Sequence, residues 1–232
     1  MMAAPGVGSH WTWTYEETLT VKKISGPRGV QLSAPSQLGK AVMALTVDEV
    51  GPDGPRRMTL SMSKGPKSLR GRTWDVGTNY GEVVLTDKLK SPGPSEELAV
   101  LRKTAGLLVK SDPILEAAAS GAPCDEGTLK KVAEATALLV KNVGSADSQT
   151  TAVKDATAEC QGKGGRYAVR FTLEYFVSEQ VITLPWKGTV EATPNLWRAH
   201  CDLRASTRSS FITGKGKLVY DQAMTFRSQL KQ

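Results

Sequence analysis

Residues 166–177 read RYAVRFTLEYFV, and this stretch has the strictest two-residue alternation in the chain. Successive side chains of a strand point to opposite faces, so such alternation separates an apolar face from a polar one. The apolar set is Tyr167, Val169, Phe171, Leu173, Tyr175 and Val177, and the polar set is Arg166, Arg170, Thr172 and Glu174. The stretch therefore predicts a long β-strand with one buried face.

The same two-residue rhythm extends outward from this strand over most of the chain. It recurs in residues 11–24, 41–50, 57–64, 181–192, 196–206 and 217–230. The link Gly-Pro-Asp-Gly-Pro at 51–55 has strong turn chemistry, so the runs before and after it should form a hairpin. Several of these strands reach about ten residues, where five or six is usual, and long antiparallel neighbours favour a strongly curved sheet or an open barrel.

Between Pro92 and Gly162 the spacing of apolar residues changes to the helical period of about 3.6 residues. Capping residues divide this block, because serine and aspartate cap helix starts, proline suits the first turn and glycine ends helices. The expected helices are one that begins after Ser95, a short one from Asp112 and Pro113 to Gly121, one over 125–142 and one over 148–160. The helix over 125–142 has the clearest apolar stripe, which includes Leu129, Val132, Leu139 and Val140.

These patterns predict an α+β fold. Its sheet is expected to be antiparallel, curved and built of long strands, like an open barrel, and a helical insert of about four helices is expected in the middle of the chain. Residues 1–10 are expected to be a flexible lead-in and 11–232 a single domain. Within that domain, residues 11–90 and 165–230 are expected to form the sheet and 94–161 the helical insert.

The composition, 40% apolar and 23% charged residues, is that of a folded globular protein. No apolar run approaches the roughly 18 to 20 residues that cross a bilayer, so no transmembrane segment is expected. The first ten residues lack the basic head and apolar stretch of a signal peptide, although a trimmed secretory precursor would also begin with small residues. If the chain is such a trimmed precursor, its expected location is periplasmic or extracellular.

The three cysteines are spaced too widely for a zinc motif. Cys124 and Cys160 are expected to approach one another at the two ends of the last helical pair and to form a disulfide in an oxidising compartment. Cys201 falls on the apolar face of its strand and is expected to stay a buried thiol.

The residues that enzymes use are sparse. The two histidines are His10, in the lead-in, and His200, which neighbours Cys201 but points to the opposite face of the strand. The glycine-rich segments 162–165 and 214–217 lack the spacing of a phosphate-binding loop, and each precedes a strand where such a loop precedes a helix. We therefore expect no enzymatic activity, no metal site and no cofactor.

Large aromatic residues gather on the apolar faces of several strands. These candidate ligand-binding residues are Trp11, Trp13, Tyr15, Phe171, Trp186, Trp197 and Phe226. Their rings suit the lining of a pocket for an apolar small molecule or a lipid, but the same rings can pack against the helices as ordinary core.

The net charge of +7 raises the prospect of an acidic partner. A candidate basic patch is formed by Arg166, Arg170, Arg198, Arg204 and Arg208, all on polar strand faces. A nucleic acid is an unlikely partner, because a single-strand binder interleaves arginines with aromatic rings and here the rings lie on the opposite face.

The layout resembles that of bacterial cell-envelope carrier and lipoprotein-type domains, in which helices fill the mouth of an unclosed barrel. The run ALTVDEVGPDG at 44–54 is also similar to the strand and turn of uncharacterised secreted β-rich families. The chain lacks a lipid-attachment cysteine, since none precedes Cys124. The resemblance implies only a binding or structural role. Together with the aromatic faces, it leads to the hypothesis of a non-catalytic, secreted or envelope-associated protein that holds an apolar or amphipathic ligand between sheet and helices. The alternative is a structural or assembly component of the cell envelope, which binds a partner protein through its basic outer face.

Overall fold

The computed structural model describes residues 6–25, 36–52, 54–64, 70–79, 82–87, 112–143, 149–162, 164–177, 180–213 and 216–231. Its strands are β1 (His10–Ser25), β2 (Ser36–Gly51), β3 (Gly54–Lys64), β4 (Thr73–Asn79), β5 (Glu82–Asp87), β6 (Gln149–Cys160), β7 (Arg166–Val177), β8 (Gln180–Thr193), β9 (Arg198–Thr213) and β10 (Gly216–Lys231). The helices are α2 (Pro113–Ala119), α3 (Glu126–Val143) and the short 3₁₀ helix η1 (Pro194–Leu196).

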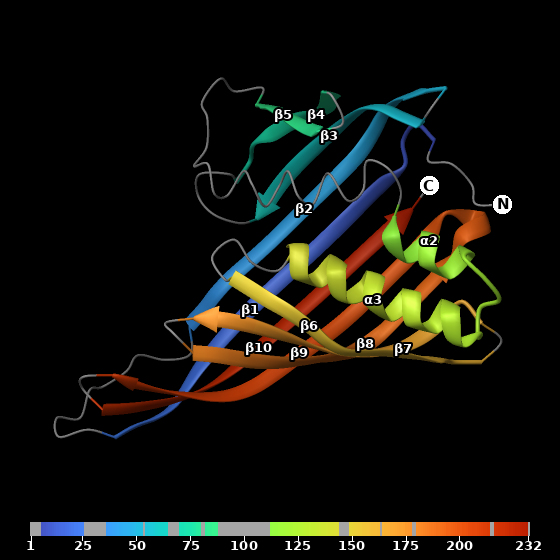
Figure 1. Ribbon diagram of the computed structural model, residues 1–232. Helices are drawn as coiled ribbons and strands as arrows, with labels where there is room; N and C mark the ends of the chain where they lie inside the picture. Colours follow the sequence, from blue (N-terminus) through green and yellow to red (C-terminus); the bar gives the residue numbers. More distant parts are fainter. Residues whose placement is uncertain are drawn as a thin grey trace.

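The strands form one curved antiparallel sheet in the order β5-β4-β3-β2-β1-β10-β9-β8-β7-β6 (Figure 1). The strands β1 to β5 pair in chain order, each with its sequence neighbour, and so do the strands β6 to β10. The two meanders meet where β1 pairs with β10 along almost their whole lengths. The sheet does not close, and β5 and β6 are its two edges in the described part of the chain. The predicted β-rich, long-stranded open sheet is confirmed.

The predicted hairpin is also confirmed, because β2 and β3 pair on either side of the turn at Gly51 and Gly54. The register places Leu45 opposite Leu60 and Met43 opposite Met62, so this pair of strands buries one apolar face. The pairing register of β2 and β3 is irregular close to the turn, where the chain reverses its direction.

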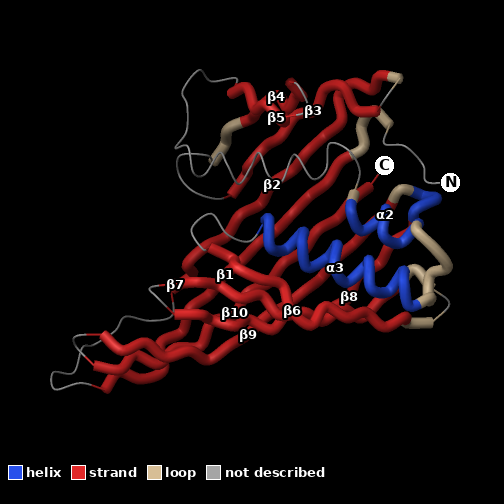
Figure 2. The backbone as a smooth tube through the Cα atoms, viewed as in Figure 1, coloured by secondary structure: helices blue, strands red, loops and turns tan. Residues whose placement is uncertain are grey.

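The helices α2 and α3 lie together on one face of the sheet, which we call the inner face (Figure 2). Helix α3 contacts β6 and β7, and α2 contacts β8, β9 and η1. The α3 stripe packs as predicted, since Val132, Leu139 and Val140 are buried and Leu129 is partly buried against the core. Neither helix has the length and the apolar character that crossing a lipid bilayer requires.

The expectation of about four helices was too high for the described residues, which contain α2 and α3 in addition to the 3₁₀ turn. The expected helix over 148–160 is wrong, because these residues form strand β6. The expected helix that begins after Ser95 lies outside the described residues.

A β-bulge explains why β6 has helical spacing. The register against β7 shifts between Lys154 and Thr157, and Asp155 between them has a positive φ of 53°. The residues that point to the inner face therefore have odd numbers before the bulge, as Val153 does, and even numbers after it, as Ala156 and Ala158 do. A shifted alternation of this kind leaves apolar residues three or four positions apart, which is the pattern of a helix.

The α3 stripe gives a direct test of the packing, because two adjacent leucines have opposite environments. Leu139 is 1% exposed and Leu138 is 43% exposed. Leu139→Ala should lower the free energy of unfolding by about 2–5 kcal/mol, since it removes buried methyl groups and leaves a cavity. The matched control Leu138→Ala should change it by less than about 0.5 kcal/mol. Urea denaturation measures both, and equal effects of the two substitutions would contradict the observed orientation of α3.

Candidate functional site

The inner face collects the predicted aromatic residues into one buried core. Six of them are 0–2% exposed: Trp11, Trp13, Phe171, Trp186, Trp197 and Phe226. The seventh, Tyr15, is paired with Phe226 in the backbone register of β1 and β10. Its side chain lies outside the described part of the chain. The structure therefore brings together residues that are far apart in the sequence and covers their rings.

Two aromatic contacts organise this core. Phe171 and Trp186 face one another across β7 and β8 with stacked rings, whose centroids are 6.2 Å apart. Trp11 and Trp197 meet edge to face with centroids 4.9 Å apart. Both arrangements are favourable for the ring quadrupoles.

Trp197 reaches this position through an unusual backbone conformation. It follows η1 at the start of β9 and has φ 49° and ψ 48°, in the left-handed region. A bulky residue rarely adopts this region, and the conformation costs of order 1–3 kcal/mol unless its surroundings hold it. Its fully buried ring beside Trp11 provides such surroundings.

Four indole N–H groups of the inner face are buried without a hydrogen-bond partner in the described part of the chain. They are the Nε1 groups of Trp11, Trp74, Trp186 and Trp197. Buried polar groups are nearly always paired, and a buried donor without a partner costs about 1–3 kcal/mol. Trp74, on β4, was not among the predicted site residues. The alternating sequence around Trp74 could have indicated that its ring is buried. Only the structure shows that its N–H group has no partner.

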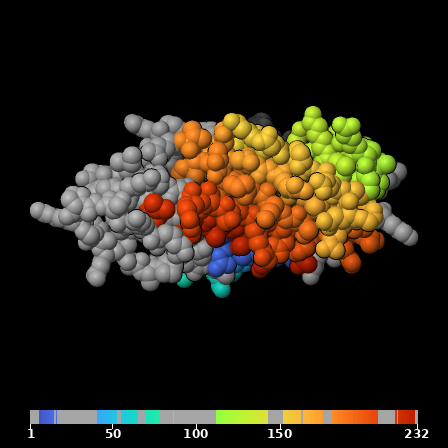
Figure 3. Space-filling view, turned by 90° about the horizontal axis from the view of Figure 1, so that it is seen from below, coloured from blue at the N-terminus to red at the C-terminus, as the bar shows by residue number. Residues whose placement is uncertain are grey.

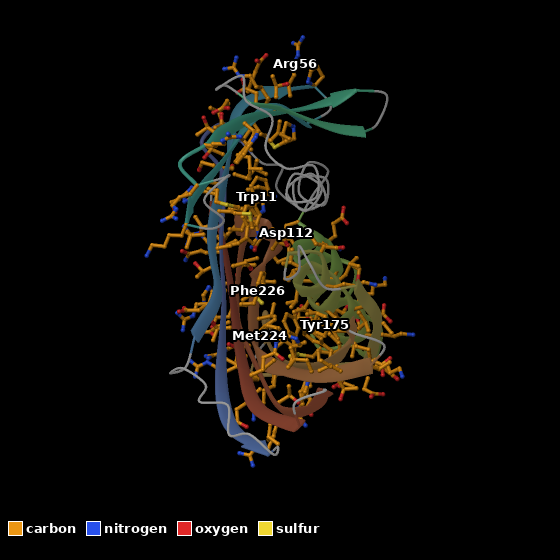
Figure 4. The ribbon with its side chains drawn as sticks, turned by 90° about the vertical axis from the view of Figure 1, so that its left-hand side faces the viewer. Trp11, Arg56, Asp112, Tyr175, Met224 and Phe226 are labelled. Carbon is orange, nitrogen blue, oxygen red and sulfur yellow. A yellow bond between two sulfur atoms is a disulfide. The ribbon has the colours of Figure 1, made fainter. Side chains whose placement is uncertain are left out.

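Asp112 is a buried acid beside these rings. It caps α2, and its Oδ1 accepts hydrogen bonds from the backbone N–H groups of Ile114, at 2.9 Å, and Leu115, at 3.0 Å. Asp112 is only 4% exposed to solvent. Figure 4 shows Asp112 close to Trp11 on the helix side of the sheet, with Phe226 and Met224 further along the same face.

Burial raises the pKa of Asp112 from 3.8 to about 6, because the interior stabilises the charged carboxylate less than water does. The two backbone N–H groups and the Trp11 side chain act in the opposite direction, and the nearby Glu116 adds a small upward effect. The Trp11 indole lies near enough to the carboxyl group to lower its pKa through hydrogen bonding, although its N–H does not meet the geometric criteria for a hydrogen bond.

Cys201 lies in the same region as a buried free thiol. Burial raises the pKa of this thiol strongly, and the charges of Asp112 and Asp202 raise it further, while a hydrogen bond with Ser228 lowers it. The thiolate is the reactive form of cysteine, so this residue is poorly suited to act as a nucleophile.

A disulfide bond joins Cys124, just before α3, to Cys160, at the end of β6. The Cα atoms are 5.5 Å apart, and the bond attaches the start of α3 to the edge strand. The expectation placed Cys160 at a helix end, whereas it ends a strand. The turn after β6 packs on the same region, because a Cβ atom at Gly164 would lie 2.7 Å from Cβ of Pro123.

The predicted basic residues lie on the outer face, which Figure 3 shows as a continuous surface running from β6 to β10. Four of them face a carboxylate, in the pairs Arg166–Glu191, Arg170–Glu159, Arg204–Asp202 and Arg208–Asp221. Arg198 is exposed. Much of the positive charge is therefore balanced on the same face, although exposed pairs of this kind contribute little to stability.

Within the described residues, no three His, Cys, Asp or Glu side chains stand together in a way that would hold a metal ion. Comparison of the sequence with protein-family models and with curated proteins finds no match. The candidate site is therefore defined by its own geometry, in which Trp11, Trp197, Asp112 and Cys201 share one buried region.

Asp112 gives a pH-dependent test of this region. Because its pKa is higher in the folded chain than in the unfolded chain, the folded state binds more protons between about pH 4 and 6, and stability should fall as pH rises through this window. Asp112→Asn keeps a good helix cap but cannot ionise. Relative to wild type, the variant should gain about 2 kcal/mol in unfolding free energy between pH 4 and 7. Urea denaturation across this range measures the difference, and parallel stability curves would contradict a raised pKa at Asp112.

Proposed function

We propose that this chain is a non-catalytic binding protein that holds an apolar or amphipathic molecule between the helices and the aromatic inner face of the sheet. The ligand would lie against Trp11, Trp186 and Trp197, with its oxygen atoms toward the indole N–H groups. Secretion or association with the cell envelope is part of this proposal. The Cys124–Cys160 disulfide supports it, since disulfides persist mainly in oxidising compartments.

The unpaired indole N–H groups carry the proposal. A core that serves packing alone gains nothing from a buried donor without a partner, and phenylalanine would fill much of the same space without that cost. Tryptophan is useful where one part of its ring meets apolar atoms and its N–H meets an acceptor. Four such donors on one face therefore favour a bound molecule that is largely apolar and carries oxygen acceptors.

The side chains around these donors suit an apolar chain. Met43, Met58, Met62 and Met224 are all buried on the inner face. Methionine is flexible and polarisable, and it adapts its shape to irregular apolar partners. An acyl or alkyl chain is therefore a better match to this face than a rigid polar molecule.

The alternative proposal, an assembly component that binds a partner protein through its basic outer face, has less support. Its arginines at 166, 170, 204 and 208 already face carboxylates of the same surface. A partner would have to compete with these pairs.

Trp11→Phe and Trp186→Phe test the proposed function, because each substitution keeps an aromatic ring and removes an indole N–H. Titration with a neutral fluorescent monoacylglycerol should show affinities lower by about five- to tenfold, which corresponds to one lost hydrogen bond. Each variant should lose some stability, since phenylalanine is smaller than tryptophan and leaves a cavity in the buried core, so thermal unfolding must first establish that each variant is folded. Trp13→Phe is the matched control, because Trp13 is 1% exposed on the same face of β1 but is not among the unpaired donors.

The control should change the affinity by less than about twofold. If Trp13→Phe weakens binding as much as Trp11→Phe, the indole N–H groups do not contact the ligand. If native mass spectrometry of protein purified from cells finds no bound molecule and no amphiphile binds, the assembly role becomes the better explanation.

A further inference from the structure

Three positively charged residues stand side by side on the outer face of the sheet. In the backbone register, Arg170 on β7 is opposite Lys187 on β8, and Lys187 is opposite Arg204 on β9. All three residues are exposed, and we call them the cationic row. Like charges directly opposite one another in a sheet are destabilising, so the stability of the fold does not explain the row.

Two members of the cationic row lack a hydrogen-bonded acceptor in the described part of the chain. Arg170 has one, because its Nη2 donates to Oε1 of Glu159 at 3.0 Å. Arg204 lies only at the limit of an ion pair, with its Nε 3.9 Å from Oδ1 of Asp202, and that oxygen accepts no hydrogen bond. Among the described residues, Lys187 has no carboxylate within ion-pairing distance, and it was not one of the predicted basic residues.

The acids of the outer face oppose a partner that is negatively charged throughout. Glu159, Glu174, Glu191 and Asp202 lie on the same face and are paired with its cations. A nucleic acid or an anionic membrane would bring phosphates against these carboxylates as well as against the row. A protein partner can place carboxylates over the row alone, which is how complementary charges give an interface its specificity.

The spacing of the cationic row matches the turns of a helix. Neighbouring strands are about 4.8 Å apart, so the row spans about 10 Å across three strands. Successive turns of an α-helix are about 5.4 Å apart, and residues i, i+4 and i+7 lie on one face. A helix that crosses β7, β8 and β9 can therefore place one acidic residue over each strand. The exposed Pro185, two positions before Lys187 on β8, offers an apolar contact beside the row.

We propose that the cationic row binds an acidic amphipathic helix of a partner protein. The helix lies across the three strands, and its carboxylates pair with Lys187 and Arg204 and relieve the repulsion along the row. Its apolar residues contact Pro185. Exposed ion pairs contribute little to stability, so Arg170 can share its contact with Glu159 at small cost. This surface is on the opposite side of the sheet from the aromatic core, so the inference is independent of the proposed ligand.

Two helical peptides of about 20 residues and identical composition test the inference. The striped peptide carries glutamates at i, i+4, i+7 and i+11 beside a row of leucines. In the scattered peptide the leucines keep their places, and the glutamates exchange places with glutamines on the other faces. Fluorescence anisotropy at about 20 mM salt, where screening is weak, should show the striped peptide binding about fivefold more tightly. At about 300 mM salt the difference should largely disappear.

Substitutions on the outer face separate the row from the general charge of the protein. Lys187→Gln should weaken binding of the striped peptide about three- to fivefold, and Lys187→Arg should preserve it. Without peptide, Lys187→Gln should not lower the Tm, since it removes contacts between like charges. Arg208→Gln is the matched control, because it removes the same charge from β9, but Arg208 already donates to Asp221 at 2.8 Å. It should change the affinity by less than about twofold.

Equal binding of the two peptides, or a preference that survives in Lys187→Gln, would overturn the helix site. Vesicles of phosphatidylglycerol provide the remaining comparison. If they bind wild type more tightly than the striped peptide does and lose affinity in Lys187→Gln, the row contacts an anionic membrane and the inference fails. These outcomes leave the proposed function intact, since no measurement involves the inner face.

Discussion

The pairing of β1 with β10 is the interaction on which the rest of this fold depends. Each meander is built from neighbours in sequence, but the two meanders become one sheet only where these strands join. The same pairing places Trp11 opposite Leu230 and Trp13 opposite Ser228. Ser228 is in turn opposite Cys201 on β9. The buried region around Asp112 is therefore assembled from both ends of the sequence and from the helical insert between them, and it exists only when the central pair has formed.

Close backbone approach within the sheet makes room for the large rings. Gly188 on β8 lies opposite Leu203, and a Cβ atom at this position would collide with the backbone carbonyl oxygen of Asp202. Next to it, Trp186 faces Ala205 across β8 and β9. Alternation of very small and very large side chains allows the rings to interdigitate and the helices to pack closely. The same packing removes the indole N–H groups from water, so the stability of the core and the unpaired donors have a common origin.

The sequence predicted the parts of the fold that depend on local periodicity. The alternation of β7 and the apolar stripe of α3 are each contained in fewer than about twenty residues and need no knowledge of partners. Strand β6 was misread, because the bulge at Asp155 moves its inward positions from odd to even. Asp112 could be recognised as a helix cap, but its burial depends on packing against β1 and β9, which no local pattern contains. The left-handed conformation of Trp197 and the unpaired indoles were hidden for the same reason.

The bulged edge strand β6 has a consequence for how copies of the molecule behave toward one another. An open sheet exposes the backbone of its edge strands, and a flat edge is a template onto which a strand of a neighbouring molecule can add. The positive φ at Asp155 interrupts the regular ladder on β6, the charged side chains of Lys154 and Glu159 lie along it, and the bond to Cys124 fixes its end. Polymerisation through this edge is therefore opposed by shape, charge and covalent attachment together, which allows the fold to keep an open sheet without growing into fibres.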